Sequence, residues 1–133
     1  MRKNINVYID IDGVILTKGV IPALHLDEFL KYILHNYSVF WLTSRSQPVK
    51  YLSQFLDSST ISLLQKVQPT NFRLDKTEAI NFSKRFFWLE CEIFASELNM
   101  LNKHGEYKSW IEVNLMKNPN QLRDLMKSKL LTN

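Results

Sequence analysis

Residues 7–15 read Val7-Tyr8-Ile9-Asp10-Ile11-Asp12-Gly13-Val14-Ile15. The segment from Asn6 to Ile9 is apolar after its first residue. A short run of β-branched and aromatic residues of this kind is typical of a strand covered on both faces, as in a parallel sheet. Asp10 marks the carboxyl end of this strand, where ligands of open parallel α/β sheets bind. The stretch therefore predicts a fold class and the place of a site.

The spacing of the two acidic residues is the second informative feature. Asp10 and Asp12 are two positions apart, so in an extended segment their carboxylates point the same way and repel each other. A bound cation, or a proton on one of the two, would relieve that repulsion. Gly13 then allows a backbone geometry that other residues find costly. The alternative interpretation is an acidic turn after an ordinary strand.

Strand and helix patterns alternate along the rest of the chain. A turn or small hairpin around Gly19 and Pro22 precedes an amphipathic helix from Leu26 to about His35. Further strands are predicted at 37–42, 61–67, 85–89 and 107–113, although a helix is equally acceptable at 61–67. Further helices are predicted from Pro48 to about Asp57, from Asp75, from Phe94 to a cap at Gly105, and from Asn118 with Leu122, Leu125, Met126 and Leu130 facing inward.

Two helix starts carry recognisable caps. Ser46 precedes Pro48 and is the expected N-cap of that helix. Asp75 and Glu78 have the spacing of a capping box, which places Lys76 at a helix start. A cation is disfavoured there by the helix dipole, so we expect an anionic neighbour for its ammonium group.

These patterns predict one α/β domain over residues 1–133. The expected architecture is a Rossmann-like three-layer sandwich, with a mostly parallel five-stranded sheet and helices on both faces. The content of 45% hydrophobic and 23% charged residues suits one globular domain. The net charge of +4 is compatible with a phosphorylated or nucleic-acid partner, although a solvated basic surface is the simpler explanation.

The remaining composition bears on location. Cys91 is the only cysteine, which excludes an intrachain disulfide and favours a reducing compartment. The apolar stretch near the N-terminus is interrupted by Asp10 and Asp12, so we expect neither a signal segment nor a spanning helix there. The expected location is cytoplasmic, without a membrane partner.

Polar residues follow the predicted strands in a recognisable order. They are Asp10-Ile11-Asp12-Gly13-Val14, then Thr43 after Phe40-Trp41-Leu42, then Lys76, then Glu90 after Phe86-Phe87-Trp88-Leu89. In this order they resemble the four motifs of the haloacid dehalogenase (HAD) superfamily. The resemblance covers the chain from about Asn6 to Glu92, and its order and spacing are more specific than any single motif.

The resemblance implies a Mg²⁺-dependent phosphohydrolase. Asp10 would be the nucleophile that forms an aspartyl-phosphate, and Asp12 would act as general acid and then as general base. The implied ligands of the ion are the Asp10 carboxylate, the Asp12 backbone carbonyl and Glu90. The groups expected around the phosphoryl oxygens are Gly13, Thr43, Ser44 and Lys76.

The fourth motif departs from the family pattern, which usually has Asp where this chain has Glu90-Cys91-Glu92. Glu90 directly follows the apolar run and is the expected ligand, with Glu92 as the alternative. Ser44 and Arg45 could touch substrate, but helix capping and solvation explain them equally well. His25, His35 and His104 have no ligand spacing.

The stretches between Asp12 and Thr43 and between Thr43 and Lys76 are each filled by predicted elements, so we expect no cap domain. In the resembling family a capless site is open and often acts on large substrates, among which nucleic-acid ends are the first candidate here. Two alternatives remain. One is a catalytically weakened binding or regulatory protein that uses the basic residues Lys117, Arg123, Lys127 and Lys129. The other, ranked last, is a receiver of the response-regulator type.

Overall fold

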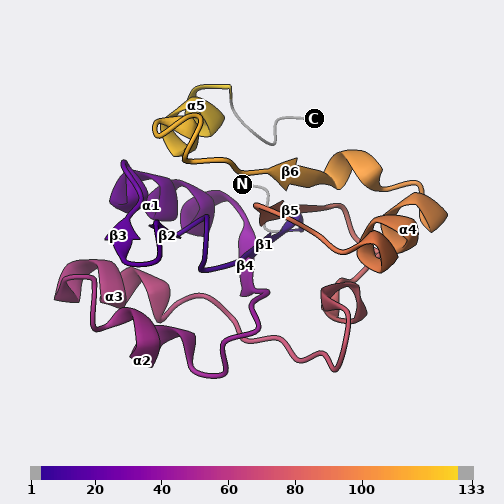
Figure 1. The fold of residues 1–133 in the computed structure, drawn as a ribbon, viewed down its shortest axis with the longest axis horizontal. Helices are drawn as coiled ribbons and strands as arrows, with labels where there is room; N and C mark the ends of the chain where they lie inside the picture. The colour runs from indigo at the N-terminus through magenta and orange to yellow at the C-terminus, as the bar shows by residue number, and fades with distance from the viewer. Residues whose placement is uncertain (1–3, 129–133) are drawn as a thin grey trace.

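A computed structural model describes residues 4–128 (Figure 1). The fold class is α/β, as predicted, although consecutive strands and consecutive helices interrupt the predicted alternation. The elements are β1 (Asn6–Ile9), β2 (Leu16–Thr17), β3 (Ile21–Pro22), α1 (Leu26–Asn36), β4 (Ser38–Trp41), α2 (Pro48–Leu52), α3 (Ser58–Leu64), the 3₁₀ helix η1 (Lys76–Ala79), β5 (Phe86–Glu90), α4 (Ala95–Lys103), the 3₁₀ helix η2 (Tyr107–Ser109), β6 (Trp110–Glu112) and α5 (Gln121–Lys127).

The main sheet has four strands in the order β4-β1-β5-β6, and each neighbouring pair is parallel. Ile9 of β1 is in register with Trp41 of β4 and Leu89 of β5. The carboxyl ends of these three strands therefore share one edge, and the polar residues that follow them are brought together. The strands β2 and β3 form the separate antiparallel hairpin that Gly19 and Pro22 predicted.

Both faces of the sheet are covered. Val7 and Ile9 of β1 belong to a core that contains buried residues of α1, α2, α3 and α5. Tyr8, between them, belongs to a second core with Trp88, Leu101 of α4 and Ile80. Figure 1 shows α4 on the opposite side of the sheet from α1. The alternation of side chains along β1 thus confirms the prediction of a strand buried on both faces.

Of the two alternatives at 61–67, the strand is wrong and the helix is confirmed, because helix α3 covers most of the segment. The Asp57 carboxylate accepts a hydrogen bond of 2.9 Å from the backbone N–H of Thr60 and caps the helix. Thr60 and Leu64, four residues apart, are its buried positions. Beyond it, Gln68 alone pairs beside β4, in an isolated bridge to Phe40. Within residues 4–128 the parallel sheet therefore has four strands and not the five predicted.

Several element ends also differ from the predictions. Helix α2 ends at Leu52 and not near Asp57, and its N-cap is Gln47, without a side-chain bond, in place of Ser46. The strand predicted at 107–113 is shorter, because residues 107–109 form η2. The predicted cap at Gly105 follows α4 with a φ of +69°. The predicted inward position of Leu130 lies outside the described residues.

The capping box is confirmed, and it begins the 3₁₀ helix η1. The Glu78 carboxylate accepts a bond of 3.1 Å from the backbone N–H of Asp75. Lys76 is thereby placed at the first position of η1, as predicted.

None of the helices within residues 4–128 combines the length and the apolar character needed to cross a bilayer.

Candidate functional site

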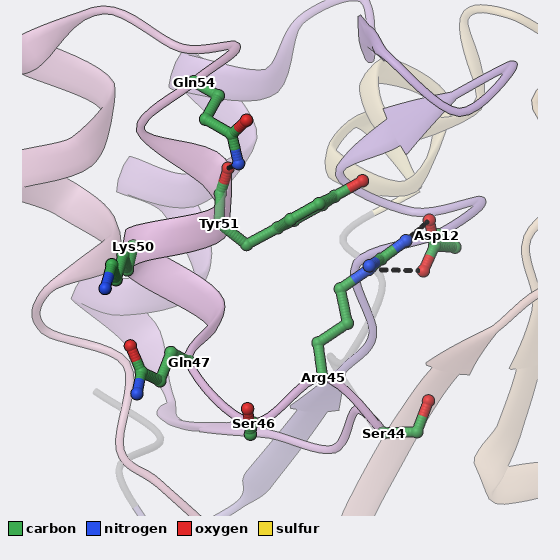
Figure 2. Close-up of a pocket in the computed structure, with 8 residues that line it drawn as sticks. All are labelled: Asp12, Ser44, Arg45, Ser46, Gln47, Lys50, Tyr51 and Gln54. Atoms are coloured by element: carbon green, nitrogen blue, oxygen red, sulfur yellow. Dashed lines mark hydrogen bonds and ion pairs between the residues drawn. The ribbon is translucent and has the colours of Figure 1, made fainter.

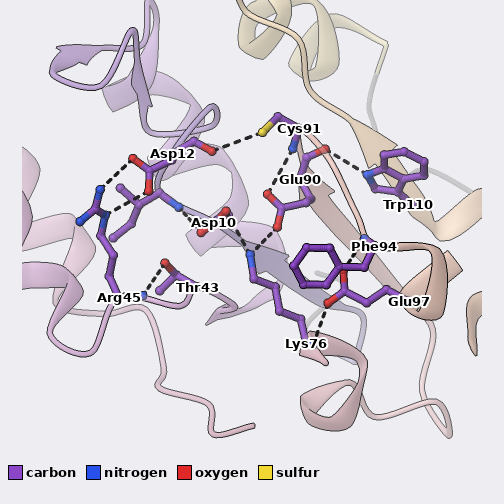
Figure 3. Close-up of polar contacts among 11 residues, drawn as sticks. Asp10, Asp12, Thr43, Arg45, Lys76, Glu90, Cys91, Phe94, Glu97 and Trp110 are labelled. Carbon is purple, nitrogen blue, oxygen red and sulfur yellow. Dashed lines mark hydrogen bonds and ion pairs between the residues drawn. The ribbon is translucent and has the colours of Figure 1, made fainter. Parts of the chain in front are cut away.

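A cluster of three charged side chains lies at the carboxyl ends of β1 and β5 (Figure 3). The Lys76 ammonium is 3.2 Å from Asp10 Oδ2 and 2.5 Å from Glu90 Oε1. The exposed fractions of the three side chains are 15% for Lys76, 10% for Asp10 and 3% for Glu90. The expected anionic neighbour of Lys76 is therefore confirmed, and there are two.

Burial and neighbouring charges shift the pKa values of Glu90 and Lys76 in this cluster. Loss of solvent, and then the adjacent Asp10 carboxylate, raise the pKa of Glu90 to about 9, although the Lys76 ammonium acts in the opposite direction. Burial alone would lower the pKa of Lys76, but Asp10 and Glu90 outweigh it and raise that pKa above its ordinary value. Burial and Asp10 therefore favour the protonated form of Glu90, whereas the Lys76 ammonium favours its carboxylate.

Glu97 fixes the position of Lys76. This carboxylate is only 2% exposed, and its Oε2 accepts a bond of 2.9 Å from the backbone N–H of Lys76. Its Oε1 accepts one of 2.9 Å from the backbone N–H of Phe94. Glu97 thus ties η1 to the start of α4. Glu97 was not among the predicted site residues, although its place three positions after Phe94 is that of a capping-box glutamate.

Two neighbouring groups hold Glu90. Its Oε2 accepts a bond of 3.2 Å from the backbone N–H of Cys91, and its backbone carbonyl accepts one of 3.0 Å from Trp110 Nε1. Glu92, the alternative ligand, is exposed and lines a separate pocket with Gly13 and Cys91. The structure therefore brings Glu90, and not Glu92, to Asp10.

Asp12 lies in different surroundings. Arg45 donates from Nε to Asp12 Oδ2 at 3.0 Å and from Nη2 to Oδ1 at 3.1 Å. The side chains of Asp12 and Arg45 are 50% and 37% exposed, and the guanidinium lies 3.8 Å from the centroid of the Tyr51 ring. The hydrogen bonds to Asp12 raise the pKa of Arg45, which keeps its charge. Separate cations therefore balance Asp10 and Asp12.

Thr43 and Ser44 lie in the loop that follows β4. The Thr43 hydroxyl accepts a bond of 3.2 Å from the backbone N–H of Arg45, and Figure 3 shows Thr43 between Arg45 and Asp10. Ser44 lines two pockets. The loop therefore brings Thr43 and Arg45 to the acidic pair, while the sequence analysis had identified no partner for Arg45.

Gly13 occupies a crowded turn. Its φ is +86°, and a Cβ atom added there would lie 2.8 Å from Cys91 Sγ. Its backbone N–H donates to the Leu16 carbonyl at 2.7 Å, so this amide is engaged in the turn and is not free for a phosphate oxygen. Cys91 Sγ also lies 3.7 Å from the backbone carbonyl of Asp12. The turn therefore needs glycine for conformation and for space.

The oxygen donors around Asp10 have the chemistry that Mg²⁺ prefers. The Asp10 and Glu90 carboxylates meet at the Lys76 ammonium, while the carboxylate of Asp12 faces Arg45. Among residues 4–128, no three His, Cys, Asp or Glu side chains are grouped to hold a metal ion. The two buried carboxylates and the Asp12 backbone carbonyl thus fit a hard cation in donor type, and the ammonium would have to give way to it.

Two open pockets flank the loop after β4. The first, here called the α2 pocket, has a volume of about 650 Å³ and is shown in Figure 2. It is lined by Asp12, Ser44, Arg45, Ser46, Gln47, Lys50, Tyr51 and Gln54. The second, of about 430 Å³, is lined by Thr43, Ser44, Arg45, Ser46, Thr70, Asn71, Phe72 and Arg73. Asp12 lines the first pocket, and its partner Arg45 lines both.

Comparisons with known proteins found no matching family model, no matching curated protein and no matching solved structure.

Proposed function

We propose that this protein is a Mg²⁺-dependent phosphohydrolase of the HAD type, with a Rossmann-like HAD fold, that works through an aspartyl-phosphate. One observation carries the proposal: Asp10 and Asp12 lie in different electrostatic surroundings. Asp10 is buried beside the Lys76 ammonium, whereas Asp12 lies half-exposed at the rim beside Arg45. Two carboxylates in unlike surroundings are suited to different tasks, one to attack and one to transfer a proton.

Each residue would have a definite role. An Asp10 oxygen attacks phosphorus while the bond from phosphorus to the leaving oxygen breaks, and Asp12 supplies the proton that the leaving alcohol needs. Water then attacks the aspartyl-phosphate and gives its proton to Asp12, which releases phosphate and restores both carboxyl groups. The Lys76 ammonium and the Thr43 hydroxyl stabilise negative charge on the phosphoryl oxygens.

Mg²⁺ would be held by Asp10, Glu90 and the backbone carbonyl of Asp12. When bound, it would offset the repulsion between the carboxylates and the negatively charged substrate. The raised pKa of Glu90, which favours its proton, follows first from its burial and then from the adjacent Asp10 carboxylate. A cation of higher charge would remove the need for that proton.

The open site favours a large phosphorylated substrate. Two pockets on either side of the loop after β4 leave room for groups beyond the phosphate, and the cations Arg45, Lys50 and Arg73 line them. Discrimination by such a site comes from contacts outside the phosphate position. Nucleic-acid ends are the first candidate, with phosphosugars and nucleotides as alternatives, and a cytoplasmic location is part of the same proposal.

The test is hydrolysis of an aryl phosphate with added Mg²⁺ and with EDTA. We expect turnover that stops with the chelator, and turnover that EDTA leaves unchanged would exclude the metal mechanism. Glu90→Ala should raise the Mg²⁺ concentration needed for activity far more than Glu92→Ala, its matched control two residues away. The reverse ranking would assign the ligand to Glu92.

A catalytically weakened binding or regulatory protein is the second candidate. The observation in its favour is that Lys76 already bridges the two carboxylates that an ion would bridge. Of the basic residues proposed for a partner, Lys117 and Lys127 are exposed, Arg123 lies 3.5 Å from Asp124, and Lys129 lies outside the described residues. Lack of turnover of any phosphomonoester by the folded, Mg²⁺-supplied protein would favour this candidate.

A further inference from the structure

The contact between Arg45 and Asp12 conflicts with proton donation by Asp12. A guanidinium that donates to both carboxylate oxygens, at 3.0 and 3.1 Å, uses both as acceptors. A general acid must instead carry a hydrogen on one oxygen and direct it at the leaving group. If the proposed function holds, Arg45 therefore has to leave Asp12 when substrate binds.

The structure provides a place for Arg45 to move. Its guanidinium lies over the Tyr51 ring, at 3.8 Å from the centroid, and forms part of the wall of the α2 pocket. Figure 2 shows the guanidinium between Asp12 and the space bordered by Ser46 and Gln47. A guanidinium can slide across an aromatic face and keep its cation–π attraction. Tyr51 can therefore support Arg45 in both positions.

The α2 pocket has the polarity of an anion site. Of the described residues that line it, Asp12 is the only acid, and Arg45 already neutralises it. Lys50 lies on the side of the pocket away from Asp12 (Figure 2), and within residues 4–128 no carboxylate lies within 4.0 Å of its ammonium. The hydroxyls of Ser44 and Ser46 add neutral donors. A cation stacked on Tyr51, a second cation without a carboxylate neighbour in the described part of the chain and several donors suit a phosphate group.

We propose that the α2 pocket receives a second phosphate group, carried by the leaving group of the substrate, and that this anion draws Arg45 away from Asp12. Bidentate contacts of arginine with phosphate resemble those with carboxylate, so the exchange conserves the hydrogen bonds of Arg45. The released Asp12 then takes up a proton from solvent water and donates it to the leaving oxygen. Esters without the second phosphate leave Arg45 on Asp12 and are hydrolysed slowly. Arg45 is thus a specificity-determining residue.

The test compares three substrates that share one type of leaving alcohol. They are a nucleoside 5′-monophosphate, the matching nucleoside 3′,5′-bisphosphate and a short oligonucleotide with a 5′-terminal phosphate. We expect kcat/KM of the native protein to be higher by about tenfold or more for the two substrates that have a second phosphate. The ranking of those two distinguishes a small bisphosphate from a polynucleotide as the source of the anion.

The deciding variant is Arg45→Met, which keeps an unbranched stem on Tyr51 and removes the charge. It should lower kcat/KM for the two substrates with a second phosphate and raise the value for the monophosphate, because Asp12 is freed. A merely structural role would lower all three values together. Arg85→Met is the matched control, because Arg85 also lies over an aromatic ring, that of Phe87, but at the opposite end of β5.

The outcomes separate this inference from the proposed function. Equal kcat/KM values for all three substrates, with Arg45→Met reducing them alike, would overturn the inference and leave the phosphohydrolase intact. If neither these three nor an aryl phosphate is hydrolysed with added Mg²⁺, the proposed function fails, and calorimetric titration then tests the pocket alone. Tighter binding of the bisphosphate than of the monophosphate, lost in Arg45→Met, would support the anion site, and equal binding would overturn it.

Discussion

Asp10 and Asp12 are separated by one residue, yet their surroundings differ in almost every respect. The Asp10 side chain is 10% exposed and contacts a lysine that is itself held through its backbone by Glu97. The Asp12 side chain is 50% exposed and contacts an arginine that rests on an aromatic ring beside an open pocket. The inner carboxylate has a fixed partner and the outer one a movable partner. Depth of burial thus separates two groups of identical chemistry.

The largest expected effect comes from removing the inner charge. Asp10→Asn should reduce kcat for an aryl phosphate by at least about a thousandfold, because an amide does not attack phosphorus. The fold should remain, since the side chains have nearly the same shape. Steady-state kinetics, with circular dichroism as the check on folding, measures this. Activity within tenfold of the native value would rule out Asp10 as the nucleophile.

The cluster of Asp10, Lys76 and Glu90, here called the inner cluster, should also make the stability of the fold depend on pH. Burial raises the pKa of Glu90 from 4.5 to about 9, so the folded protein keeps a proton that the unfolded chain loses. The stabilisation is fully present below about pH 4.5 and is lost as the pH rises toward 9. In the absence of metal, the free energy of unfolding of the native protein should therefore decrease between about pH 4.5 and pH 9. Relative to Glu90→Gln, which has no proton to lose, the decrease should be a few kcal/mol, on the order given by 1.4 kcal/mol per pKa unit.

Urea unfolding at several pH values in EDTA measures this difference. Asp10, Lys76 and Cys91 face or adjoin Glu90, and Glu90 raises the pKa values of Lys76 and Cys91, so the difference between the two proteins includes the response of these neighbours. Glu92→Gln is the control, and its curve should follow that of the native protein, because Glu92 lies outside the cluster. The pKa values of Asp57, Glu78 and Asp124 are lowered in the folded protein, so these groups change the stability only in more acidic solution. Parallel curves for the native protein and Glu90→Gln would show that Glu90 is ionised throughout.

The turn that follows the two carboxylates should be the next most sensitive part. Gly13→Ala places a methyl group 2.8 Å from Cys91 Sγ at a φ of +86°, and we expect a loss of about 2–4 kcal/mol of stability. Gly19→Ala is a matched control, because Gly19 has a φ of +83° and no atom within 4 Å of the added Cβ. It should cost only about 1 kcal/mol. Equal losses of stability for the two variants in thermal unfolding would mean that the Cys91 side chain moves away from the added methyl group at no cost in free energy.

The inner cluster could be predicted from the sequence because it depends on strand order. Asp10 and Glu90 each end an apolar run, and parallel strands place their carboxyl ends at one edge of the sheet. Lys76 was found through the capping box of Asp75 and Glu78. These signals are local in the sequence, and the backbone alone determines where they meet. The elements β1, α1, β4 and β5 could be predicted for a similar reason, because the spacing of their apolar residues fits only one type of secondary structure.

The parts that could not be predicted depend on long side chains or on ambiguous patterns. Arg45 reaches Asp12 across 33 positions of sequence, and nothing next to Arg45 in the chain indicates that partner. The segment 61–67 has an apolar run that is compatible with either period, and its helix is decided by Asp57, which caps the preceding turn. Glu97 was overlooked because Phe94 is an unusual cap residue.

The smallest effect on stability should come from the exposed pair of Asp12 and Arg45. Arg45→Met removes both hydrogen bonds to Asp12, but the two side chains are largely solvated, and exposed ion pairs contribute little to folding. The methionine stem can still pack against Tyr51. We therefore expect no change in the melting temperature outside experimental error, at low or moderate salt. A clear drop would show that Arg45 holds the loop after β4 in place. It would also mean that Asp12 has a fixed partner like that of Asp10, and the contrast between the two carboxylates would then rest on burial alone.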